Sequence, residues 1–74
     1  MKADLLQRKV GDAIRHSRGS LGLSQEAFAD KVGMHRTYYS AIERGERNLT
    51  LQSLNRISEG LGVKLADLFL RAGI

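Results

Sequence analysis

Apolar positions recur at intervals of three and four residues in five segments of the chain. The first segment runs from about residue 4 to residue 18, and its inward face comprises Leu6, Val10, Ala13, Ile14, Ser17 and Leu21. This spacing is typical of one face of an α-helix. No run of alternating β-branched residues is long enough to indicate a strand. The pattern therefore predicts an all-α fold of five helices.

Polar residues and glycines mark where the other four segments begin and end. Ser24 and Thr50 are good N-caps for the second and fourth helices, and Gly33 and Gly62 end them. The third helix is expected over residues 36–44, and Gly45 ends it. The last is a short helix over about 65–70, with Leu65, Leu68 and Phe69 as its apolar residues. Only two residues separate the glycine after the second helix from the third, which is a helix-turn-helix spacing.

The length of 74 residues suits one domain over positions 1–74. A chain this short buries a small core, and without cysteine it has no disulfide to stabilise it. A second copy of the chain could supply the missing stability. Two histidines without other soft ligands predict no metal site, and nothing in the sequence predicts a cofactor.

The sequence predicts neither a membrane protein nor an enzyme. Its longest apolar run, at residues 68–70, is far shorter than the roughly 18 residues of a membrane helix, so we expect a cytoplasmic protein. No set of nucleophile, base and orienting residue can be recognised. The formal charge of +4 suits a polyanion such as DNA.

The third helix divides into two different faces at about 100° per residue. Tyr38, Tyr39 and Ile42 form an apolar and aromatic face. The opposite face has no acid, as base edges and phosphates require, and comprises Arg36, Thr37, Ser40, Ala41 and Arg44. This helix is therefore the expected DNA-reading element.

Several short motifs resemble the Cro/repressor-type, or XRE, helix-turn-helix family. They are Gly-Leu-Ser-Gln-Glu at 22–26, Phe-Ala-Asp-Lys-Val-Gly at 28–33, Ile-Glu-Arg-Gly-Glu-Arg-Asn at 42–48, Leu-Gly-Val at 61–63 and Asp-Leu-Phe at 67–69. His-Arg-Thr-Tyr at 35–38 and the short length are similar to the controller proteins of restriction–modification systems. The resemblance implies a dimeric regulator of transcription that reads double-stranded DNA.

The resemblance also implies roles for individual residues. By family position, Gln25 contacts a phosphate and braces the third helix, while Arg18 and Glu43 form a buried ion pair. The bases are read by Arg36, Thr37 and Ala41, with Tyr38 and Ser40 beside them. The DNA backbone is gripped by Arg44, Arg47 and Asn48. The last helix is where the family dimerises, so dimer contacts are expected from Leu65, Leu68 and Phe69.

Four positions depart from the family pattern. His35 stands where a Ser or Thr often caps the third helix, so the first turn of that helix is expected to be less well fixed. Lys64 replaces a similar cap before the last helix. Ala41 replaces a longer polar residue of some members, so base readout there is expected to be lost or reduced to contact with a thymine methyl. Gly60 lies inside the fourth helix, where alanine is better by roughly 1 kcal/mol.

Two further questions stay open at the level of sequence. An antitoxin-like module that binds a protein and only secondarily DNA is the alternative function. An activator would also need a surface for RNA polymerase, for which exposed Glu46 is a candidate.

Overall fold

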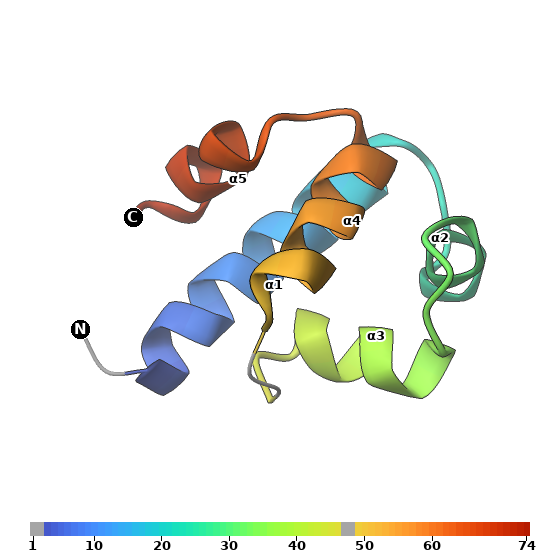
Figure 1. Ribbon diagram of the computed structural model, residues 1–74, viewed down its shortest axis with the longest axis horizontal. Coiled ribbons are helices and arrows are strands. Elements are labelled where there is room, and N and C mark those ends of the chain that lie inside the picture. Colours follow the sequence, from blue (N-terminus) through green and yellow to red (C-terminus); the bar gives the residue numbers. More distant parts are fainter. Residues whose placement is uncertain (1–2, 47–48) are drawn as a thin grey trace.

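All regular structure in residues 3–46 and 49–74, the part of the chain that the computed structural model describes, is helical (Figure 1). The five helices of this part are α1 (Ala3–Ser20), α2 (Gln25–Lys31), α3 (Arg36–Glu43), α4 (Leu51–Leu61) and α5 (Leu65–Ala72). The prediction of an all-α, five-helix fold is confirmed. None of these helices is long and apolar enough to cross a bilayer.

Side chains cap the first turns of α2, α3 and α4, and only the cap of α3 was not predicted. Ser24 Oγ accepts a hydrogen bond from the Ala27 amide at 3.0 Å. The Thr50 hydroxyl caps α4 in the same way. The expectation of a poorly fixed first turn in α3 was wrong, because His35 Nδ1 accepts from the Thr37 amide at 3.1 Å. An imidazole nitrogen therefore does what a hydroxyl usually does at an N-cap.

All five helices contribute buried side chains to one core. Its fully buried members include Ile14, Phe28, Tyr39, Ile42, Ile57 and Leu68. The Phe28 and Tyr39 rings pack at a centroid distance of 5.3 Å and hold α2 against α3. Leu6 and Leu21, expected on the inward face of the first helix, are exposed: Leu6 lies in the first turn of α1, and Leu21 lies in the turn that follows the helix.

Helix α1 packs against both α3 and α5, and two glycines allow its close approach to α3. A Cβ atom at Gly11 would lie 2.6 Å from the carbonyl oxygens of Ile42 and Glu43. At Gly45, which has a φ of +73°, a Cβ would lie 2.8 Å from Arg8 Cα. The first half of α1 is therefore held directly against the end of α3, as Figure 1 also shows.

The expectation that alanine would be better than Gly60 was wrong. A Cβ atom there would lie 2.4 Å from Val32 Cγ1 and 3.2 Å from Phe28 Cζ. Helix propensity favours alanine by roughly 1 kcal/mol, but the approach of α2 leaves no room for a methyl group.

Candidate nucleic-acid interface

The two faces of α3 are separated in the structure as the helical spacing predicts. Tyr39 and Ile42 are fully buried, whereas Arg36, Thr37 and Arg44 are exposed. A rigid helix therefore presents cationic and hydroxyl side chains to solvent. Such a surface is what a helix needs in order to contact phosphates and base edges.

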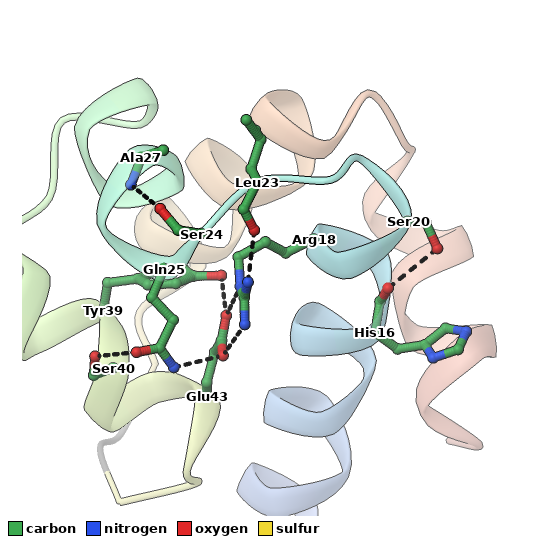
Figure 2. A network of polar contacts seen from close by, with 10 residues as sticks. All are labelled: His16, Arg18, Ser20, Leu23, Ser24, Gln25, Ala27, Tyr39, Ser40 and Glu43. Atoms are coloured by element: carbon green, nitrogen blue, oxygen red, sulfur yellow. Dashed lines mark hydrogen bonds and ion pairs between the residues drawn. The ribbon is translucent and has the colours of Figure 1, made fainter.

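An ion pair fixes α3 to α1. Arg18 Nε lies 2.6 Å from Glu43 Oε2, and Arg18 Nη2 lies 3.1 Å from Glu43 Oε1 (Figure 2). The exposed fraction of the side chain is 14% for Arg18 and 1% for Glu43. Arg18 Nη1 also donates to the Leu23 carbonyl at 2.7 Å, so the same guanidinium reaches the turn before α2. The predicted pair is present, and it connects three elements.

Gln25 links α2 to two residues of α3. Its Nε2 donates to Glu43 Oε1 at 2.9 Å, and Ser40 Oγ donates to its Oε1 at 2.8 Å (Figure 2). Tyr39 donates its hydroxyl to the other oxygen of Glu43. The bracing role expected of Gln25 is thus seen in its contacts, and the Glu43 carboxylate accepts hydrogen bonds from three side chains.

Burial and hydrogen bonding oppose each other at this carboxylate. Burial by itself raises the pKa of Glu43, but the hydrogen bonds that its carboxylate accepts outweigh this effect and hold the pKa below its ordinary value. The hydrogen bond with Glu43 raises the pKa of Arg18. Burial, followed by the bond to Glu43, raises the pKa of Tyr39. The network therefore consists of an anion, a cation and a neutral phenol at neutral pH.

The exposed face of α3 forms a hollow that runs from the N-cap of the helix to its C-cap. The residues that line it are His35, Arg36, Thr37, Ser40 and Arg44. Four of these five belong to the expected DNA-binding set, and they come from one helix whose rear is fixed in the core. The hollow is therefore the best candidate for a contact with bases.

Each arginine of this face has an acidic neighbour that lies outside α3. Arg36 Nη1 lies 3.4 Å from Glu26 Oε2 of α2, and Arg44 Nε lies 3.1 Å from Glu46 Oε2. All four side chains are exposed, so these pairs are weak and can exchange for a phosphate or a base. As predicted, α3 itself contributes no acid to this face, but Glu26 and Glu46 lie beside its arginines in the folded chain.

The other residues of the expected DNA-binding site differ in how exposed they are. Ala41 is only 6% exposed, which corrects the expectation that it reads a base: its side chain lies at the border of the buried face of α3. Tyr38 and Ser40 are half-buried. Arg47 and Asn48 lie outside the described residues.

The prediction that three apolar residues of α5 form dimer contacts is corrected for one of them. Leu68 is fully buried within the chain, because it lies on the side of α5 that packs against α1, so it cannot contact a second copy. Leu65 and Phe69 are half-buried. Phe69 lines a mostly apolar groove together with Leu6, Gln7, Val10, Leu49, Leu54 and Ile74.

Sequence reasoning missed this groove because its residues come from distant segments. The available signal was that Leu6 lies near one end of its helix, where an inward-facing residue can lose its cover. Within residues 3–46 and 49–74, no grouping of side chains is suited to holding a metal ion.

Comparison with known proteins agrees with this geometry. A family model described as helix-turn-helix matches residues 3–68. The control protein C.MunI of a Mycoplasma species is 55% identical over 47 residues, which cover 64% of this chain and 64% of that relative. The control protein C.BamHI of Bacillus amyloliquefaciens is 46% identical over 59 residues, covering 78% of this chain and 73% of that protein.

The fold is also similar to a solved structure of the same kind. The restriction–modification controller protein C.AhdI from Aeromonas hydrophila superimposes with a TM-score of 0.87 at 32% sequence identity. The match covers 93% of this chain and 100% of that one.

Proposed function

The chain belongs to the helix-turn-helix family, and from this premise we propose that it is a sequence-specific, DNA-binding regulator of transcription that acts as a homodimer. In this proposal α3 enters the major groove. Two copies read half-sites roughly one helical turn, about 34–36 Å, apart on a near-palindromic operator. The protein performs no catalysis in this role.

One observation carries the proposal. Two arginines and two hydroxyl residues of α3 share one hollow, while the buried carboxylate of Glu43 fixes the helix to α1 and α2. A base-reading side chain must be held in a defined place, because discrimination between bases depends on the direction of hydrogen bonds. Arg36 is the proposed base-reading residue, because its guanidinium can donate bidentate hydrogen bonds to O6 and N7 of a guanine.

Other side chains are proposed to contact the DNA backbone or to support the reading helix. Gln25 and Arg44 both line a second hollow next to α3 and are proposed phosphate contacts. Thr37, Tyr38 and Ser40 are proposed to contact phosphates or bases beside Arg36. We retain Arg47 and Asn48 as proposed backbone contacts by family position alone.

The groove that Phe69 lines is the proposed dimer contact. Leu6 and Ile74 in it are exposed in the single chain, and exposed apolar clusters of this kind favour association. Half-buried Leu65 and Phe69 remain proposed dimer residues, whereas Leu68 does not.

The similarity to control proteins supports a narrower proposal. We propose that the chain regulates the genes of a restriction–modification system. Contact with RNA polymerase through Glu46 is a further proposal. In the free chain the Glu46 carboxylate pairs with Arg44. This exposed pair would have to open before Glu46 could contact the polymerase and Arg44 a phosphate.

Selection of bound duplexes from a random DNA pool tests the proposal. We expect one enriched motif with two inverted half-sites about one helical turn apart. Enrichment of no sequence would contradict specific binding, and enrichment of a single unrepeated half-site would contradict the dimer. Expression of a reporter placed behind the selected site then gives the sign of the regulation.

A further inference from the structure

A polar hollow lies between α1, the start of α2 and the end of α3. Its lining comprises Arg8, Asp12, Arg15, Gln25, Glu43, Arg44 and Glu46. Gln25 and Arg44 are already proposed phosphate contacts. The arginines contributed by α1 have no role in that proposal.

Two of the three acids that line this hollow are paired with arginines and therefore repel a phosphate less than a free carboxylate would. Glu43 is buried and paired with Arg18, and Glu46 is paired with Arg44. Asp12, Arg8 and Arg15 are exposed, and none of the three takes part in an ion pair with another described residue. The unpaired side chains therefore leave a surplus of one positive charge at the edge of the hollow, which suits an anion.

Backbone packing fixes where these arginines lie. Arg8 is held against Gly45, at the end of the reading helix, and Gly11 is held against the carbonyl of Glu43. Arg15 follows Arg8 by seven residues, two helical turns, and so lies on the same side of α1 about 10 Å farther along its axis. Both arginines line the same hollow as Gln25 and Arg44.

We propose that Arg8 and Arg15 grip the DNA backbone as a second row of phosphate contacts beside α3. The inference rests on the proposed function, and it extends the interface from the helix-turn-helix unit to α1. A phosphate in the hollow would meet Arg8 and Arg44 toward one end, and Arg15 with the Gln25 amide toward the other. Asp12, between the two arginines, opposes this binding by charge repulsion.

Salt dependence of DNA binding tests the inference. Binding of the wild type and of the double variant Arg8→Ala/Arg15→Ala to a random-sequence duplex, and to a duplex from the selection, is measured by fluorescence anisotropy between about 50 and 200 mM salt. We expect the double variant to bind both duplexes on the order of tenfold more weakly near 0.1 M salt, and its salt slope to fall by about two per bound chain. Discrimination between the two duplexes should stay the same, since phosphates carry no sequence information.

Matched variants separate a phosphate contact from a general effect of charge. Arg56→Ala/Lys64→Ala removes the same charge from exposed positions that do not line the hollow, and we expect a smaller loss and an unchanged slope. Arg8→Lys/Arg15→Lys should keep the wild-type slope, because a lysine is also a point charge for a phosphate. Asp12→Asn should strengthen binding to both duplexes.

Each outcome bears on one proposal or the other. An unchanged slope in Arg8→Ala/Arg15→Ala, with a wild type that binds DNA, would overturn the inference and leave the proposed function standing. Equal losses in Arg8→Ala/Arg15→Ala and in the control Arg56→Ala/Lys64→Ala would overturn it as well. If the wild type binds no DNA, the proposed function fails together with this inference. Thermal melting confirms that the variants are folded, which we expect because both arginines are exposed.

Discussion

Arg18 and Glu43, 25 residues apart in the chain, form a bidentate ion pair that connects α1 to the carboxyl-terminal end of α3. The carboxylate is 1% exposed and also accepts hydrogen bonds from Gln25 and Tyr39. The position of the exposed arginines of α3 therefore depends on a carboxylate that cannot itself contact DNA.

Glu43→Ala should destabilise the fold by about 3 kcal/mol, because the guanidinium of Arg18 and the hydroxyl of Tyr39 would lose their shared acceptor in a poorly hydrated place. The measurement is urea unfolding followed by circular dichroism. Glu26→Ala is the control: it removes an exposed partner of Arg36, and we expect a change below about 1 kcal/mol. A Glu43→Ala midpoint equal to that of the wild type would show that the pair contributes nothing.

The same carboxylate predicts how stability depends on pH. A carboxylate with a lower pKa in the folded than in the unfolded chain contributes stability above the unfolded pKa, and this contribution is lost as the pH falls through the folded pKa. The pKa of Glu43 is lowered from an ordinary value of 4.5, so the loss should begin near that pH and continue below it. We expect the difference in unfolding free energy between wild type and Glu43→Gln to be constant near neutral pH. It should shrink in acid, and a difference that grew in acid would contradict the assignment.

Gly60→Ala should destabilise the chain by about 1–3 kcal/mol despite the better helix propensity of alanine. The cause is the approach of Val32 Cγ1 to within 2.4 Å of the new methyl group. Gly19→Ala, within α1, is the matched control, since a Cβ there meets nothing within 4 Å. Its expected effect is a small gain in melting temperature. Equal gains from both variants would show that α2 can move away from α4.

Replacing Arg36 by alanine should cost about 1–3 kcal/mol on the selected site and relax the preference at one base pair of each half-site. Arg47→Ala should weaken binding to all sequences about equally and lower the salt slope by about one per chain. Titrations on selected and random duplexes at several salt concentrations measure both effects. If Arg47→Ala abolished discrimination while Arg36→Ala kept it, the two proposed roles would be reversed.

The charged variant Phe69→Lys should shift the chain toward monomer and weaken binding to the selected site, because it places an ammonium group in the proposed dimer groove. Leu21→Lys, in the turn after α1, also adds a charge at an exposed leucine but does not line the groove, so we expect it to remain dimeric. Sedimentation equilibrium at micromolar concentration checks this. A monomeric wild type with tight binding to an inverted repeat would contradict the dimer.

Local features of the sequence determined the helices and most of their ends. The spacing of apolar residues, the caps at Ser24 and Thr50 and the glycines that follow α2 and α4 act within a few residues of the chain, so they can be read without knowledge of the fold. The same is true of the two faces of α3, because 100° per residue separates Tyr39 and Ile42 from Arg36 whatever lies nearby.

Only the tertiary structure decided which residues at the borders of those faces are covered. Ala41 and Leu68 lie on helices that sequence could place, but burial depends on elements that are distant along the chain. The unsuitability of alanine at Gly60 arises in the same way, from the approach of α2. The position of Arg8 beside the reading helix follows from how closely α1 packs against Gly45. Helical periodicity describes a single element, whereas burial and close approach are properties of pairs of elements, and pairs exist only once the chain has folded.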